Sequence, residues 1–275
     1  MSKLLKRAFA LSICIILLVS EIFNTNVAKA AKTGIETGYG CQVGKYVYYA
    51  FEMDGVRMGI RRYNTKAKKS KEIFSYKING EGSNGFYDIS VKGNYIYTVW
   101  DQNYGTGASR TYIYRIKKDG SKSKRLACGI KPVIIGNRIY YEKCKEVQVD
   151  YGDFYDTETV STGKMYSMKL DGSDKKKAGS VKIKKLSGDW FENKKTDITN
   201  GYRYFIKGKN LYREKADTGK VKRLMSSSDG ITKFYVCNQY ILVKARYDKG
   251  YRMAAYIMKT NGKDKKRLAS WWAAE

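Results

Sequence analysis

The chain has 275 residues, of which 54 are lysine or arginine and 26 are aspartate or glutamate, so its formal net charge at pH 7 is +28. It contains no histidine, which excludes imidazole general bases, histidine-containing triads and histidine metal sites. One proline, 26 glycines and 25 tyrosines are typical of many strands joined by tight turns.

The first 30 residues have the pattern of a secretory signal peptide. Three basic residues precede an apolar run over residues 8–19, which is short for a membrane span. Ala28-Lys29-Ala30 is a small-x-small cleavage site, whereas a buried helix or a retained anchor explains neither the basic start nor this end. We therefore expect residues 1–30 to be removed and residues 31–275 to form one domain that is secreted or held at the cell surface. No second apolar stretch of spanning length follows, so the mature chain is expected to have no transmembrane segment.

A repeated order of strands and turns fills the rest of the chain. A strand follows a glycine or asparagine turn in five places: Val47-Tyr48-Tyr49, Ile96-Tyr97-Thr98, Ile139-Tyr140-Tyr141, Arg203-Tyr204-Phe205 and Ile241-Leu242-Val243. A second β run follows each of them, at residues 60–63, 112–116, 165–170, 211–215 and 255–259. Polar turns such as Asp119-Gly120 and Asp171-Gly172 end these runs and favour type I′ hairpins, in which both central residues have a positive φ.

A short basic strand then completes each unit, as at Lys124-Arg125-Leu126, and another strand precedes the first turn, as at residues 86–91. Four strands in roughly 40–50 residues match a propeller blade. No segment keeps a 3.6-residue apolar period, so we expect almost no helix. The predicted fold is an all-β β-propeller of five four-stranded blades, with six blades as the alternative. A β-sandwich would not explain the repeated order of turns.

Two of these segments resemble a known repeat. Residues 113–121 (Ile-Tyr-Arg-Ile-Lys-Lys-Asp-Gly-Ser) and 165–173 (Met-Tyr-Ser-Met-Lys-Leu-Asp-Gly-Ser) look like the second half of the YWTD repeats of low-density-lipoprotein-receptor-like propellers. The pattern is also similar to an uncharacterised propeller family of secreted Gram-positive bacterial proteins. The resemblance implies a propeller over residues 33–270. It implies no receptor function, since the Tyr-Trp-Thr-Asp tetrapeptide itself is absent.

The predicted propeller has two unlike faces. Turns between strands one and two and between strands three and four share one face, and they are short. The other connections, at residues 75–85, 101–110, 143–163 and 179–196, are long and irregular. Variable loops on a rigid scaffold often carry binding residues, so we expect a ligand site on this long-loop face.

The acidic and aromatic connection over residues 143–163 is the strongest candidate for that site. The expected ligand contacts are Tyr151, Asp153, Phe154, Tyr155 and Asp156, with Trp100 and Tyr104 of the neighbouring blade completing an aromatic rim. A solvated loop whose aromatic rings pack onto the blade is the alternative. Asp150, Asp153 and Asp156 lack the spacing of a calcium-binding loop, so no metal or cofactor is predicted.

Lysines gather at the turns of the opposite face. Those expected to bind a polyanion are Lys118, Lys175, Lys176, Lys177, Lys265 and Lys266. A solvated charged surface is the ordinary alternative. The more specific interpretation is adherence to an envelope polyanion, such as teichoic acid or anionic phospholipid head groups. Nucleic acid is not expected, because the chain has an export signal and no nucleic-acid-binding motif.

Catalytic motifs are few, with no Gly-x-Ser-x-Gly and no phosphate-cradling loop. We therefore expect a non-catalytic extracellular binding module for cell-envelope polymers, glycans or surface proteins. The alternative is a secreted polysaccharide-active enzyme that uses loop carboxylates such as Asp153 and Asp156. Carboxylates that converge in one pocket on the long-loop face would favour the enzyme, and dispersed carboxylates would favour binding.

Four cysteines remain after removal of the signal and could oxidise outside the cell. A hairpin that turns at Gly136-Asn137 and pairs Ile134 with Arg138 places Cys128 opposite Cys144, and we predict that these two form a disulfide. Cys41 and Cys237 lie near the ends of the innermost strands of the first and last blades. We predict a second disulfide between them if five blades close the ring.

Overall fold

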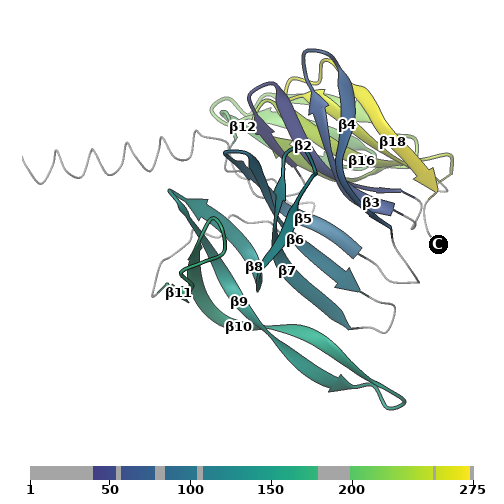
Figure 1. Ribbon diagram of the computed structural model, residues 1–275. Coiled ribbons are helices and arrows are strands. Elements are labelled where there is room, and N and C mark those ends of the chain that lie inside the picture. The colour runs from purple at the N-terminus through teal and green to yellow at the C-terminus, as the bar shows by residue number, and fades with distance from the viewer. Residues whose placement is uncertain are drawn as a thin grey trace, which may run out of the picture.

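The computed structural model describes residues 40–53, 57–77, 84–103, 108–178, 199–249 and 252–272. Within these residues all regular structure is β-strand, which agrees with the prediction of almost no helix. Within each sheet, every strand pairs antiparallel with the next along the chain (Figure 1). The described part of the chain holds no helix of the length and apolarity needed to cross a membrane. The predicted signal peptide, residues 1–30, lies outside the described residues.

The described strands form five sheets, of which the second and third are continuous through β8. The first sheet contains β1 (Gly40–Val43), β2 (Tyr46–Met53), β3 (Arg57–Asn64) and β4 (Lys69–Lys77). The second contains β5 (Asn84–Lys92), β6 (Tyr95–Asn103), β7 (Ser109–Lys117) and the first half of β8 (Ser123–Ile135). The third contains the second half of β8, β9 (Arg138–Asp150), β10 (Tyr155–Lys169) and β11 (Lys176–Lys177). The fourth contains β12 (Tyr202–Lys207), β13 (Asn210–Lys215) and β14 (Val221–Ser226), and the fifth contains β15 (Ile231–Cys237), β16 (Tyr240–Tyr247), β17 (Arg252–Lys259) and β18 (Lys266–Trp272).

Strand β8 connects the second and third sheets without a loop. Its N-terminal half pairs with β7 and its C-terminal half pairs with β9. The register shifts between Ile130 and Val133, where Lys131 has a φ of 52°. Such a bulge bends a strand and increases its twist, which lets one strand serve two sheets.

Apolar side chains hold neighbouring sheets face to face. Tyr48 of β2 packs toward the second sheet, whereas Val47 and Tyr49 of the same strand pack toward the fifth sheet. Two further clusters join the second sheet to the third and the fourth to the fifth. The clusters therefore give the spatial order fourth, fifth, first, second, third, and among the described residues none joins the third sheet to the fourth. Antiparallel meanders stacked in this way are β-propeller-type architecture.

The two classes of short turn lie on one face, as the sequence predicts. In the first, second and fifth sheets, the residue that follows the third strand donates its N–H to a carbonyl of the turn that precedes the second strand, and in the fourth sheet the residue after β13 donates in the same way to the turn before β12, each at 2.9 Å. These pairs are Thr65 with Lys45, Lys118 with Asn94, Ala216 with Gly201, and Thr260 with Gln239. We call this surface the turn face.

The predicted type I′ geometry of the Asp-Gly turns is wrong. Only the glycine has a positive φ, which is 81° at Gly120 and 88° at Gly172. Asp119 and Asp171 keep an ordinary φ because each carboxylate accepts hydrogen bonds from the backbone N–H and the hydroxyl of the serine two residues later. The side chain thus sets the turn type.

The connection over residues 143–163 is not an irregular loop. β9 and β10 continue as a paired ladder from Cys144 opposite Ser161 to Asp150 opposite Tyr155, and the hairpin projects at the lower edge of Figure 1. Threonines and valines that alternate along both strands favour this extended pairing. Of the other predicted connections, residues 75–77, 84–85, 101–103 and 109–110 are strand, while residues 78–83, 104–107 and 179–196 lie outside the described residues.

The turn at Gly120 packs directly against the backbone of the first sheet. A Cβ atom at Gly120 would lie 1.9 Å from the carbonyl oxygen of Ile73 in the first sheet, whereas a Cβ at Gly44, with a φ of 56°, meets nothing within 4 Å. An alanine at positive φ costs about 1–2 kcal/mol. We expect Gly44→Ala to lower the free energy of unfolding by about 1 kcal/mol and Gly120→Ala by at least about twice as much, measured by urea denaturation. Equal losses would contradict a role of this turn in sheet packing.

Candidate functional site

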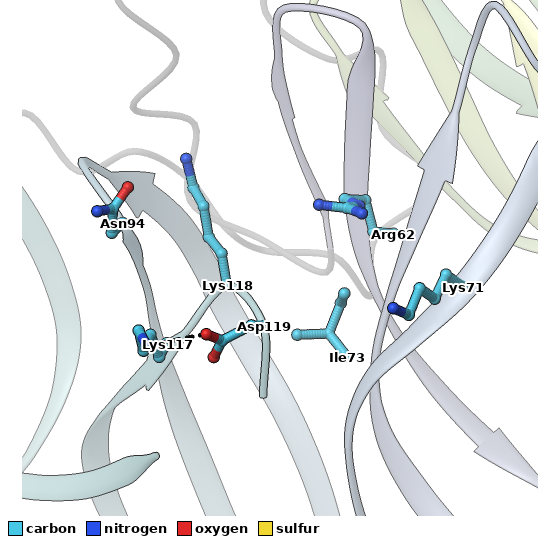
Figure 2. A pocket seen from close by; sticks show the side chains of 7 residues that line it. All are labelled: Arg62, Lys71, Ile73, Asn94, Lys117, Lys118 and Asp119. Atoms are coloured by element: carbon cyan, nitrogen blue, oxygen red, sulfur yellow. Dashed lines mark ion pairs between the residues drawn. The ribbon is translucent and has the colours of Figure 1, made fainter. Parts of the chain in front are cut away.

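A cavity of about 300 Å³ opens on the turn face between the first and second sheets. The first sheet contributes Arg62, Lys71 and Ile73, and the second contributes Asn94, Lys117, Lys118 and Asp119 (Figure 2). Figure 2 shows the side chains of Arg62 and Lys71 extending toward the turn that carries Lys118 and Asp119. The cavity is therefore lined by four cations and one carboxylate.

Strand pairing places these side chains together. Arg62 of β3 and Lys71 of β4 are direct partners across the first sheet, so their side chains share a face. In the second sheet, the hydrogen bond from the Lys118 N–H to the Asn94 carbonyl joins the two turns that supply the other wall. Ile73 is buried and gives the cavity an apolar floor.

Asp119 is the one carboxylate among the described residues that line the cavity, and its charge is balanced by an ion pair with Lys117. Asp119 accepts hydrogen bonds of 2.9 and 2.7 Å from the N–H and hydroxyl of Ser121, and its other oxygen lies 2.9 Å from Lys117 Nζ. These hydrogen bonds and the lysine hold the pKa of Asp119 well below its usual range. In the described part of the chain, no hydrogen bond or ion pair engages the ammonium groups of Lys71 and Lys118. The cavity therefore keeps an excess of positive charge.

The lysines predicted to bind a polyanion lie in different parts of the turn face. Lys118 lines the cavity, whereas Lys175, Lys176 and Lys177 are exposed at the end of the third sheet. Lys176 lies 3.9 Å from Asp174. In the fifth sheet, Lys265 lies 5.9 Å from the centroid of the Tyr256 ring, and Lys266 donates to the carbonyl of Lys68 in the first sheet. The structure thus brings only Lys118 of this set to the cavity.

Arg62 and Lys71 are not among the predicted binding residues, because they lie within strands rather than in the lysine-rich turns. A usable signal was present, since Arg115 with Lys124 and Arg213 with Lys222 occupy the same paired positions in other sheets. A cationic pair that recurs at fixed places in a repeat indicates a shared surface.

The predicted aromatic site on the long-loop face is only partly assembled. Tyr151 and Phe154 stack at the tip of the β9–β10 hairpin with ring centroids 5.4 Å apart, and Tyr155 is 68% exposed beside them. Trp100 is buried in the core between the first two sheets, against Phe74 and Phe86, so it does not complete a rim. Its strand brings it inward because alternate residues of β6 face that interface. Tyr104 lies outside the described residues.

Carboxylates of the hairpin do not converge on a pocket. Asp156 pairs with Arg110 at 2.7 Å, Glu146 accepts a hydrogen bond from the Tyr112 hydroxyl at 2.8 Å, and Asp153 is exposed. Across the described ranges, no group of three or more carboxylate or cysteine residues is arranged to hold a metal ion. The described carboxylates of the hairpin therefore do not form the paired arrangement that the alternative of an enzyme with loop carboxylates requires.

Two partly buried carboxylates in the second sheet were also missed. Burial raises the pKa of Asp88 to about 6, and the nearby Lys131 lowers it only in part. Burial also raises the pKa of Asp101, which accepts a hydrogen bond of 3.0 Å from the Thr111 hydroxyl. Asp88 occupies a bulge in β5 with a φ of 53°, and the sequence gives no sign that this position is enclosed.

The structure holds all four cysteines as thiols, so neither predicted disulfide is formed in it, although Cys128 and Cys144 are hydrogen-bonded to each other. Gly129 opposite Lys143 brings Cys128 opposite Cys144, although Arg138 pairs with Ile135 rather than with Ile134. The bulge in β8 corrects that one-residue difference. Cys41 lies in β1 and Cys237 in β15, and both side chains are fully buried. The two strands contact each other.

No protein-family profile and no curated protein matches the sequence. Among solved structures, the chain is similar to the AtxE2 isopeptidase, with 11% identity and a TM-score of 0.38 over 83% of this chain and 43% of that chain. It is similar to TolB from Acinetobacter baumannii (17% identity, TM-score 0.29, 83% of this chain and 54% of that chain). It is also similar to a chain of a nidogen/laminin complex (12% identity, TM-score 0.30, 83% and 76%). The chain spans less than half the length of the isopeptidase, and none of these likenesses assigns it a substrate or partner.

The raised pKa of Asp88 makes the free energy of unfolding depend on pH. Its folded pKa of about 6 lies above the ordinary value of 3.8, so its protonated form is favoured in the fold. The resulting stabilisation is complete below about pH 4 and is lost as the pH rises through about 6. Asp88→Asn should therefore raise the free energy of unfolding by about 1–3 kcal/mol at pH 7, and by much less at pH 4. Urea denaturation at both pH values tests this, and an equal gain at both would contradict it.

Cys128 and Cys144 should join under mild oxidation. The Cys128 thiol donates a hydrogen bond to the Cys144 sulfur, which lowers the pKa of Cys144 and favours its thiolate form. Closure of this loop should add up to about 3 kcal/mol of stability. Non-reducing peptide mapping of the exported protein is the measurement, with Cys128→Ser as the control that leaves Cys144 a thiol. Recovery of both thiols from the oxidised wild-type protein would refute the disulfide.

Proposed function

We propose that the protein is a non-catalytic extracellular binding module whose turn face holds a phosphate-bearing polymer of the cell envelope. The observation that carries the proposal is the cavity on that face, where Arg62, Lys71, Lys117 and Lys118 meet a single, neutralised carboxylate. A polyanion with regularly spaced charges complements such a surface.

The turn face as a whole supports the proposal. Most of its aspartates lie in local ion pairs, with Lys117, Lys215 and Lys259 among their partners. Other exposed lysines on this face have no ion pair with another described residue: Lys122, Lys175, Lys177, Lys220 and Lys263. The surface potential of this face is therefore positive, and a surface of this kind attracts an anionic polymer at long range.

We propose also that the sheets are five blades of a closed propeller, which would arrange the turns as a ring. Support comes from the junction of the chain's first and last sheets, where the Gln239 N–H donates to the side-chain oxygen of Gln42 at 3.1 Å. In the same region Gly40 lies against Leu242, since a Cβ there would be 2.5 Å from its Cδ1. Export to the cell surface is part of the proposal and rests on the signal pattern of residues 1–30.

Binding to a purified phosphodiester wall polymer should weaken steeply with salt, because exposed charges are screened within about 10 Å at 0.1 M ionic strength. Lys175→Glu combined with Lys177→Glu should weaken binding by at least about tenfold at low salt, since each basic residue near an anionic surface contributes about 1 kcal/mol. The measurement is an affinity titration at low and high salt.

Lys145→Glu combined with Lys164→Glu is the matched control, because both residues are exposed on the β9–β10 hairpin and the charge change is the same. This variant should bind within about twofold of the wild type. Equal losses in the two variants would show that the polymer responds to net charge alone, and salt-independent binding would contradict the proposal.

A further inference from the structure

A repeated contact joins neighbouring sheets on the turn face. Arg115 and Lys124 are partners across the second sheet, and both donate to carbonyls in the turn of the third sheet. Arg115 Nη1 lies 3.5 Å from the Leu170 oxygen, and Lys124 Nζ lies 3.2 Å from the Asp171 oxygen. The two cations thus link the second sheet to the third by hydrogen bonds, and we call such an interface closed.

The same contact occurs at one other interface, and a third interface has only its lysine, which reaches a different turn carbonyl. Arg213 and Lys222 of the fourth sheet donate to the carbonyls of Thr260 and Asn261 in the fifth sheet, each at 3.3 Å. From the fifth sheet, Lys266 donates to the carbonyl of Lys68 in the first. A backbone carbonyl that accepts from a cation is a favourable inter-sheet contact, so these pairs serve the fold.

The cavity lies at the interface between the first and second sheets, where the cations do not reach the turn carbonyls. We call this the open contact. Arg62 and Lys71 are the equivalent pair of the first sheet, and Lys118 and Asp119 occupy the equivalent turn positions of the second. Among the described residues, no hydrogen bond runs from either cation to those two carbonyls. Arg62 lies 4.3 Å from the centroid of the Tyr46 ring. Arg115 and Arg213 each stack on a tyrosine in the same way and still donate to turn carbonyls. Stacking therefore does not explain why Arg62 makes no such hydrogen bond.

Lys118 is the residue that differs. The neutral residues Leu170 and Thr260 stand at its position in the turns that accept the closed contacts. A lysine there adds a third positive charge to the cavity that Arg62 and Lys71 also line, and like charges lining one cavity repel each other. Three cations are thus held together at one interface without a carboxylate to compensate them, which costs stability unless an anion is present.

We propose that this open contact binds one phosphate group of the polymer's repeat unit, with Arg62 as a two-pronged donor and Lys71 and Lys118 as the flanking cations. The planar guanidinium matches two phosphate oxygens, and the ammonium groups balance the charge. The cavity of about 300 Å³ lies at the lower end of small-molecule sites, so a phosphorylated polyol or sugar fits over the Ile73 floor. The proposal rests on the proposed function and names the group that this face recognises.

Isothermal titration with glycerol 3-phosphate, and with acetate as the weaker anion, tests the site. The test variant is Lys71→Gln combined with Lys118→Gln, which leaves Arg62 on its tyrosine. The matched control is Lys124→Gln combined with Lys222→Gln, which removes the same charge from the same face at two lysines that already donate to turn carbonyls. Wild type and control should bind glycerol 3-phosphate within about twofold of each other, and the test variant at least about tenfold more weakly, since a hydrogen bond to a charged group contributes about 1.5–3 kcal/mol.

Thermal unfolding gives a second readout that a purely structural role of these lysines would not reproduce. Without ligand, the control variant should lose stability, because Lys124 and Lys222 each close an interface, whereas the test variant should keep or gain stability. Glycerol 3-phosphate should raise the melting temperature of wild type and control but not of the test variant. Loss of stability in the ligand-free test variant would overturn the idea of an open contact.

The outcomes separate the two proposals. The phosphate site is refuted, and the polymer-binding face stands, if the wild type binds the polymer but not glycerol 3-phosphate. The same conclusion follows if the test and control variants bind glycerol 3-phosphate equally. If glycerol 3-phosphate binds through Lys71 and Lys118 while the polymer does not bind, the phosphate site stands and the proposed function fails. Acetate binding as tight as glycerol 3-phosphate would refute the preference for phosphate.

Discussion

The first, second and fifth sheets carry apolar clusters on both faces, so each of them must be covered from two sides. In β2, Tyr48 packs toward the second sheet while Val47 and Tyr49 pack toward the fifth. A four-stranded sheet with this pattern loses apolar burial on one side if either neighbour is missing. For the first sheet, that neighbour is the last one in the chain. The contact between the chain's ends, and the stacking of the remaining sheets, follow from this requirement.

The stacking also fixes where polar groups meet. Turns that end in Asp-Gly lie against the outer strand of the preceding sheet, and glycine is needed there because a side chain at Gly120 would overlap the backbone of Ile73. Cations on β7, β13 and their partner strands reach the turn carbonyls of the next sheet. One interface departs from this rule at Lys118. A fold that repeats its stabilising contacts makes such a departure visible, and the departure coincides with the cavity.

Strand positions were largely predictable, because alternating apolar residues between glycine and asparagine turns are a local signal. The predictions for Trp100 and for residues 143–163 were wrong or incomplete for a different reason. Trp100 belongs to a strand whose alternate residues face a neighbouring sheet, and no local pattern says which face is covered. The acidic segment became a hairpin because its two halves pair with each other, although its composition looks like that of a loop.

The sequence by itself determined the all-β class, the repeat, the order of strands and turns and the sharing of one face by the short turns, since each depends on residues close together in the chain. Only the tertiary structure decided which cations meet. Arg62 and Lys118 come from different sheets and are unremarkable in their own segments. Their convergence depends on the packing of one sheet against the next, and so does the enclosure that raises the pKa of Asp88. Electrostatic consequences of this kind arise from distance and burial, which the order of residues along the chain does not contain.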